Sequence, residues 1–173
     1  MLIVAPKHAG KTTFILHLLS AGFAITGDEL VLLRDREVIA FPRKFYLRDG
    51  SLPLLPGLAA ALPRHLPFVT TPADGRLVAV DPTVFGRPWR IAPAPLAAIL
   101  YLEPGHGGPT RVLSSGKLDI IGRVLPQCTP PQSGRPGWVA DLCGTINGAE
   151  TALLQIGDLA SATNVLRGML GVK

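Results

Sequence analysis

The chain has 173 residues, of which 47% are hydrophobic, 17% are charged and 6% are aromatic, and it carries 19 glycines and 17 prolines. This apolar fraction excludes a disordered chain, and a chain of this length can bury roughly two-thirds of its unfolded surface. The net charge of +5 favours anionic partners such as nucleotides or acidic peptides without choosing among them. We therefore expect one folded domain over residues 1–173.

The cysteines and the longest apolar run indicate the cellular compartment of this chain. Cys128 and Cys143 form no Cys-x-x-Cys pair, which indicates reduced thiols rather than a disulfide framework or a zinc site. Residues 91–102 are interrupted by Pro93 and Pro95 and are fewer than the roughly 18 to 20 residues that a membrane helix requires. These features predict a soluble, cytoplasmic protein that does not span a membrane.

The first predicted elements are a strand, a loop and a helix. Residues 2–5 form an apolar run typical of a buried central strand. Residues 6–10 read as a loop, and residues 11–21 carry apolar side chains at helical spacing. Gly22 suits the C-terminal end of this helix, because glycine adopts a positive φ at little cost.

The remaining elements are short strands and helices separated by loops. The expected strands are short apolar runs at 23–25, 30–33, 38–41, 68–71, 77–80, 97–102 and 151–156. Hairpin turns are expected at 34–37 and 72–75. The expected helices are 57–62, 118–125 and 159–170, the last with Asp158 as its cap. Residues 126–136 are rich in proline and glycine and predict a mobile loop of the kind that often serves substrates.

The strongest motif is Ala5-Pro-Lys-His-Ala-Gly-Lys-Thr12, which matches Gly-x-x-x-x-Gly-Lys-[Ser/Thr] except for the alanine in place of the first glycine. A loop that leaves a strand and opens a helix presents successive backbone N–H groups to one phosphate. Lys11 would bridge the β- and γ-phosphate oxygens, and the Thr12 hydroxyl would hold Mg²⁺. The plain alternative is a strand-to-helix turn with a solvated Lys11. The predicted ATP-binding residues are Pro6, Lys7, His8, Ala9, Gly10, Lys11, Thr12 and Thr13.

Asp28 and Glu29 are adjacent acids at the end of an extended run. Such a pair is costly unless it meets water, a cation or another partner, and Mg²⁺ would supply one. In a phosphate-loop fold one of the two would coordinate the metal and the other would accept a hydroxyl proton. The alternative is an exposed acidic turn without a function.

Two arginines are candidates for contact with the substrate. Arginine forks suit phosphate oxygens and substrate carboxylates, so we expect Arg43 and Arg90 to face the site. A nucleic-acid surface is the rival interpretation of the basic residues. The aromatic residues Phe45, Tyr46 and Trp89 form no repeated stacking pattern, and the sequence holds no recognised nucleic-acid motif.

The order of these elements resembles the catalytic domain of HPr kinase/phosphorylase and its smaller relatives, the HPr-kinase-like proteins found with lasso-peptide biosynthesis. The resemblance rests on Pro6-Lys-His-Ala-Gly-Lys-Thr-Thr13, on Gly27-Asp-Glu-Leu-Val-Leu-Leu33 and on Val38-Ile-Ala-Phe-Pro-Arg43. It extends more weakly to residues 81–102 and to Ile156-Gly-Asp-Leu159 with the helix after it.

The resemblance implies an α/β fold of the HPr-kinase/PEP-carboxykinase type, with a mixed sheet and flanking helices. It implies that Asp28 is the general base toward a serine hydroxyl and that Glu29 helps Thr12 to hold Mg²⁺. The second acid is Glu where the family has Asp, and the strand and His-Gly element that usually precede the phosphate loop are absent from the sequence. We therefore expect a shortened relative, a fragment, or a chain whose sheet is completed by a partner, including a second copy of itself.

The sequence thus predicts an ATP-dependent kinase that phosphorylates a serine of a peptide or small protein, with Lys11 and Asp28 as its catalytic residues. Two other interpretations stay open. One is a nucleotide-binding accessory module that changes conformation without a phosphate acceptor, and the other is a basic nucleic-acid-binding protein.

Overall fold

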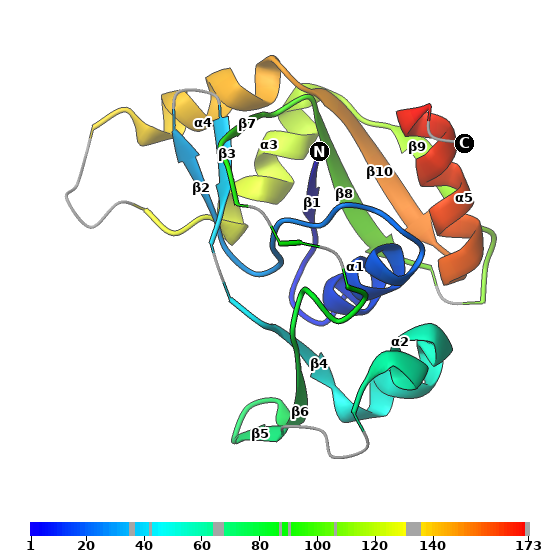
Figure 1. Ribbon diagram of the computed structural model, residues 1–173. Helices are drawn as coiled ribbons and strands as arrows, with labels where there is room; N and C mark the ends of the chain where they lie inside the picture. Colours follow the sequence, from blue (N-terminus) through cyan, green and yellow to red (C-terminus); the bar gives the residue numbers. More distant parts are fainter. Residues whose placement is uncertain are drawn as a thin grey trace. The chain divides into compact units, whose positions relative to one another are not determined.

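Figure 1 shows the computed structural model, which describes residues 1–34, 37–41, 43–63, 68–86, 88–89, 91–105, 107–130 and 136–171, apart from the side chain of Arg34. The strands are β1 (Leu2–Val4), β2 (Val31–Arg34), β3 (Glu37–Ala40), β4 (Phe45–Arg48), β5 (Phe68–Thr71), β6 (Gly75–Val80), β7 (Ala94–Pro95), β8 (Ala98–Pro104), β9 (Arg111–Ser114) and β10 (Glu150–Ile156). The α-helices are α1 (Lys11–Ser20), α2 (Pro56–Ala61), α3 (Lys117–Val124), α4 (Trp138–Asn147) and α5 (Leu159–Leu170), and the 3₁₀ helices are η1 (Asp49–Leu54) and η2 (Leu125–Gln127).

The chain divides into two compact units. Unit 1 comprises Met1–Lys11, Leu33–Val38 and Pro93–Lys173, and unit 2 comprises Thr12–Leu32 and Ile39–Ala92. The architecture is mixed α/β, with a mixed sheet and flanking helices, as the sequence predicts. No helix within the described residues is both long enough and apolar enough to cross a membrane.

The mixed sheet lies in unit 1, with its strands in the order β1-β8-β10-β9. β1 and β10 run parallel to β8 on either side of it, so that Tyr101 lies between Val4 and Leu153, and β9 is antiparallel to β10. β2, β3 and β7 form a separate three-stranded sheet. The carboxyl ends of three parallel strands therefore meet at one edge of the mixed sheet, which is where ligands bind in open α/β sheets.

The helices α3 and α4 cover one face of this mixed sheet. Their apolar side chains form a core with the strand residues on that face, comprising Leu96, Ile99, Tyr101, Ile120, Val124, Leu142, Ile146, Ala149 and Leu153. Helix α5 packs against β10 and β9. It begins as expected at Asp158, whose carboxylate Oδ1 accepts a hydrogen bond from the Ser161 backbone N–H at 2.8 Å.

Unit 2 contains an antiparallel sheet in the order β4-β6-β5. Phe45 and Leu47 of β4 lie opposite Val80 and Val78 of β6, and all four side chains are fully buried. The hairpin predicted around residues 72–75 is confirmed, because β5 and β6 pair in antiparallel register around the turn at 72–74. Its glycine, Gly75, has a φ of +71°, as a tight connection demands.

The predicted strand at 23–25 is wrong, because the end of α1 uses that segment. The Phe23 N–H donates to the Leu18 carbonyl at 3.0 Å, and the Gly22 N–H donates to the Leu19 carbonyl at 3.1 Å. With a φ of +98° at Gly22, this is a Schellman cap. The cap takes the Phe23 amide and turns the chain away from an extended path.

The expectation of a central first strand is also wrong. Within the described residues β1 pairs with β8 alone, at the edge of the mixed sheet, and its three residues are half-buried. An apolar run predicts burial of both faces, but it does not distinguish an edge strand whose faces are covered from a central one.

The other strands and helices that the sequence predicts are present to within a few residues, whereas β4, β7, β9 and α4 were not anticipated. β9 is exposed along its whole length and therefore shows no apolar alternation, and α4 contains Gly144, a residue that is unfavourable inside a helix. Of the loop predicted at 126–136, residues 131–135 lie outside the described part of the chain, and η2 occupies its start.

Candidate functional site: a phosphate-type loop and two polar pairs

The loop between β1 and α1 has an unusual backbone conformation. His8 and Gly10 have φ angles of +68° and +83°, and His8 is the one non-glycine residue with a positive φ among those the structure describes. Because Lys7, Ala9 and Lys11 have negative φ, the sign alternates along residues 7–11. Alternation of φ is one feature of a nest, in which successive backbone N–H groups form a concavity that binds anions.

The loop is anchored at its start and open at its tip. Ala5 and Ala9 are buried, whereas Lys7, His8 and Gly10 are exposed. The Ala9 N–H donates to the Pro6 carbonyl at 3.2 Å, which closes the turn. A Cβ at Gly10 would meet nothing within 4 Å, so its positive φ rather than a close contact favours glycine there. Ala5, which takes the place of the first glycine of the motif, is buried directly after β1.

Directly after the loop, the second residue of α1 is paired with one of the predicted acids. The Thr12 hydroxyl donates to the Asp28 carboxylate Oδ2 at 2.6 Å, and this pair is partly buried within unit 2. A hydrogen bond of this length to a carboxylate is charge-assisted and therefore strong. It fixes the rotamer of Thr12 and leaves the hydroxyl oxygen able to accept a cation.

Asp28 stands on a tightly packed backbone. A Cβ at the preceding Gly27 would lie 2.9 Å from the Cβ of Ala40, so a larger residue would force the two segments apart. The Phe41 N–H donates to the Leu30 carbonyl at 3.1 Å, and the Trp89 indole N–H donates to the Thr26 carbonyl at 3.0 Å. These contacts hold the segment that carries the acidic pair.

Glu29 belongs to a second pair in unit 2. The Arg43 guanidinium lies 2.6 Å from the Glu29 carboxylate and 5.4 Å from the centre of the Tyr46 ring. The two charged side chains are 41% and 45% exposed, so the ion pair contributes little to stability and stays accessible to a ligand. The structure thus brings Thr12 to Asp28 and Arg43 to Glu29. Arg90, the other predicted substrate contact, lies outside the described residues.

The donor set fits a nucleotide-bound magnesium ion. The part of the chain that the structure describes holds no cluster of three or more His, Cys, Asp or Glu side chains that could bind a metal. Mg²⁺ at a phosphate site does not require one, because phosphate and water oxygens fill most of its octahedral shell and the protein supplies one or two oxygens. The Thr12 hydroxyl and the Asp28 carboxylate are two such oxygens, held 2.6 Å apart.

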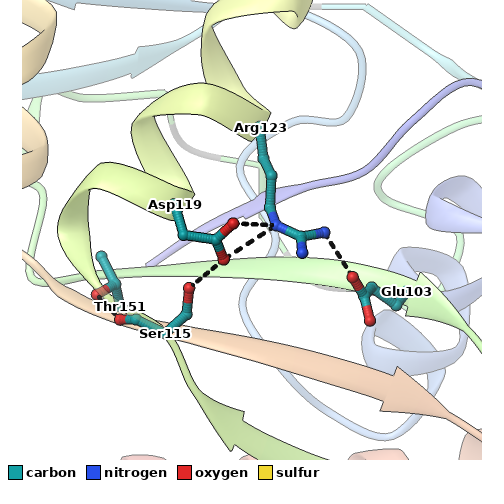
Figure 2. Close-up of polar contacts among 5 residues, drawn as sticks. All are labelled: Glu103, Ser115, Asp119, Arg123 and Thr151. Atoms are coloured by element: carbon teal, nitrogen blue, oxygen red, sulfur yellow. Dashed lines mark hydrogen bonds and ion pairs between the residues drawn. The ribbon is translucent and has the colours of Figure 1, made fainter.

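A third polar group, which the sequence analysis missed, lies in unit 1 and is drawn in Figure 2. The Arg123 Nε donates to Asp119 at 3.0 Å and its Nη1 donates to Glu103 at 2.5 Å. The Ser115 hydroxyl donates to Asp119 at 2.6 Å, and the Thr151 hydroxyl donates to the Ser115 carbonyl at 3.0 Å. The one feature of the sequence that could have indicated this group is Glu103, a carboxylate near the end of a buried apolar strand.

The electrostatics of this group follow from its hydrogen bonds. The Ser115 hydroxyl and then the Arg123 guanidinium hold the pKa of Asp119 below its usual value. The same contact with Asp119, together with that to Glu103, raises the pKa of Arg123. Arg123 is therefore always charged, and Asp119 is ionised at neutral pH.

Comparison with protein-family models, with curated proteins and with solved structures finds no match for this chain. What the loop and the polar pairs can do follows from their own chemistry.

Proposed function

We propose that this chain binds Mg²⁺–ATP and transfers the γ-phosphoryl group to a serine hydroxyl on a peptide or small protein. One observation carries the proposal: a loop with alternating φ runs into a helix whose first residue is Lys11 and whose second residue gives its hydroxyl proton to a carboxylate. The resemblance of the surrounding motifs to HPr kinase/phosphorylase supports the choice of a hydroxyl acceptor.

The loop would bind the polyphosphate. The backbone N–H groups of the nest and of the first turn of α1 donate to phosphate oxygens, and the helix dipole adds to their attraction. Lys11, as the first residue of α1, brings a full positive charge to the same turn. Lys7 is exposed in the loop and serves as the matched comparison for that charge.

The Thr12 hydroxyl would hold the metal ion, and Asp28 would orient that hydroxyl. Bound Mg²⁺ neutralises charge on the β- and γ-phosphates, which favours departure of the leaving group. The Thr12 oxygen would accept the ion while its proton stays directed at Asp28, with which it forms a 2.6 Å hydrogen bond. Glu29 would join this shell only after release from Arg43, to which it is bound in the structure.

The chemical step requires a proton acceptor. The serine oxygen attacks the γ-phosphorus, the bond from that phosphorus to the β–γ bridging oxygen breaks, and ADP leaves with the electron pair. The serine proton passes to the carboxylate of Asp28, which is the role that the resemblance implies for it. Arg43, released by Glu29, would face the acceptor or its phosphate.

Titration calorimetry with Mg²⁺–ATP tests the nucleotide site. Wild type should bind, Lys11→Ala should weaken binding by at least tenfold, and Lys7→Ala should change it by less than threefold. Equal affinity of wild type and Lys11→Ala would refute the phosphate-loop assignment.

Transfer is tested with γ-labelled ATP and a panel of serine-containing peptides. Label on a peptide supports the kinase. Binding and hydrolysis without transfer to any peptide would favour the accessory-module interpretation instead. A salt-dependent mobility shift with DNA or RNA, in the absence of nucleotide binding, would favour the nucleic-acid interpretation.

A further inference from the structure

The polar group of Figure 2 runs from Thr151, level with the start of β8, to Glu103 near the carboxyl end of β8. Val4 of β1 pairs with Tyr101 of β8 in parallel register. Two residues after this pair, β8 reaches Glu103, and the chain that leaves β1 reaches Pro6, where the loop opens. Neighbouring strands lie about 4.8 Å apart, so Glu103 and the start of the loop share one end of the sheet. Both belong to unit 1.

Arg123 is held at this end by two carboxylates and a ring. Its Nη1 is bound to Glu103 of β8, its Nε is bound to Asp119 one turn earlier on α3, and its guanidinium lies 5.2 Å from the centre of the Tyr101 ring. These contacts restrict the long side chain to one orientation. Asp119 is itself fixed by Ser115, whose carbonyl binds Thr151 of β10.

The guanidinium keeps donors available despite these contacts. The Arg123 side chain is 33% exposed, and its Nη2 has no partner among the described residues. Arginine donates through a planar fork that matches the oxygens of a phosphate, and such charge-assisted bonds are among the stronger ones in proteins. Asp119 faces solvent, where water screens its charge.

We propose that Arg123 is a second cation of the phosphate site, and that its Nη2 binds terminal oxygens of the triphosphate while Glu103 and Asp119 hold the guanidinium in place. The inference rests on the proposed function and adds to it the recognition of the γ-phosphate. The nest and Lys11 would bind ADP and ATP alike, whereas Arg123 would distinguish ATP.

The test compares Mg²⁺–AMP-PNP, a triphosphate that is not hydrolysed, with Mg²⁺–ADP by calorimetry on the full chain. Arg123→Met keeps the apolar stem over Tyr101 and removes the charge. It should weaken AMP-PNP binding by roughly 10-fold to 100-fold, the worth of a charge-assisted hydrogen bond, and change ADP binding by less than twofold. Arg111→Met is the matched control, because Arg111 is exposed on β9, at the far edge of the same sheet and about 14 Å from β1.

Circular dichroism first establishes the temperature at which each variant is folded. If Arg123→Met does not fold, the Arg123→Lys variant is used instead, because an ammonium group cannot bind two carboxylates and a phosphate at once. The Arg123→Lys variant should lose at least threefold in AMP-PNP affinity relative to ADP. An unchanged ratio of the two affinities in the deciding variant overturns the role of Arg123 and shows a purely structural ion pair. If wild type binds neither nucleotide, the phosphate site itself is refuted, and the role of Arg123 falls with it.

Discussion

At the scale of single residues, the hydrogen bond between Thr12 and Asp28 makes the two roles of that carboxylate separable. An amide in place of the carboxylate retains an oxygen that can accept the Thr12 proton, but it cannot take a proton from the acceptor hydroxyl. Asp28→Asn should therefore leave nucleotide affinity within a few-fold of wild type while it lowers phosphoryl transfer by about 10² to 10⁴. Calorimetry and labelled transfer measure the two effects. If affinity and transfer collapse together and excess Mg²⁺ restores both, Asp28 is a metal ligand and not the base.

The hydrogen bond from Ser115 to Asp119 should make the stability of the protein depend on pH in the acid range. Because this bond lowers the pKa of Asp119, Ser115→Ala should raise that pKa toward the usual value near 3.9. The stability that the bond supplies is fully present above the unfolded pKa and is lost as the pH falls through the lower folded pKa. Carboxyl titration by NMR measures the shift. Wild type should lose more stability than the variant as the pH falls below about 4, and a pKa that Ser115→Ala leaves unchanged would contradict the assignment of its cause.

At the scale of secondary-structure elements, the connection from β10 to α5 depends on a glycine. A Cβ at Gly157 would overlap the carbonyl oxygen of Gly108 and lie 3.0 Å from the Thr110 backbone nitrogen. The Thr110 hydroxyl also accepts from the Gly157 N–H at 3.1 Å. Backbone cannot yield as a flexible side chain does, so Gly157→Ala should destabilise unit 1 by about 2 kcal/mol or more.

Helix α3 provides the control for that substitution. A Cβ at Gly122 would meet nothing within 4 Å, and glycine in a helix interior costs about 0.5 to 1 kcal/mol relative to alanine. Gly122→Ala should therefore stabilise the protein by about that amount. Urea denaturation of the two variants should show opposite signs, and destabilisation of similar size in both would mean that the contact at Gly108 is not the cause.

Sequence reasoning worked for elements whose pattern is local. The hairpin of β5 and β6, the strands β8 and β10, and helix α5 with its Asp158 cap all carry their signals within a few residues. It failed for elements whose structure depends on contacts with other segments of the chain. Phe23 was predicted to be extended, but its amide takes part in the Schellman cap. β1 was predicted to be central, but its place in the sheet depends on the positions of β8 and β10, which its own sequence does not show.

The same distinction applies to the candidate site. The loop, Lys11, Thr12 and the acidic pair are readable in sequence because a motif fixes their spacing. The pairing of Thr12 with Asp28 rather than Glu29, and of Glu29 with Arg43, depends on side-chain geometry between segments 14 to 16 residues apart. The partners of Arg123 come from β8 and α3, which no motif connects.

At the scale of the whole molecule, binding to the folded state should raise its stability. Mg²⁺–ATP at a hundred times its dissociation constant adds about 2.7 kcal/mol, which for a chain of this size corresponds to a rise in Tm of about 5 to 10 °C. Thermal melts with Mg²⁺–ATP, with ATP and EDTA, and with the Lys11→Ala variant measure it. The rise should shrink without the metal and fall by about half or more in Lys11→Ala, whereas the absence of any rise in wild type would count against tight nucleotide binding.

The left-handed backbone at His8 has a consequence for how such a protein evolves. A non-glycine residue in that conformation costs about 1 to 2 kcal/mol, and the packing of the rest of the fold has to offset this cost. A glycine at position 8 would remove this cost from the folded chain, but it would also raise the conformational entropy of the unfolded chain. Selection for stability therefore acts on this position in two opposing directions, and a histidine retained there in related chains would indicate that the shape of the loop is itself under selection.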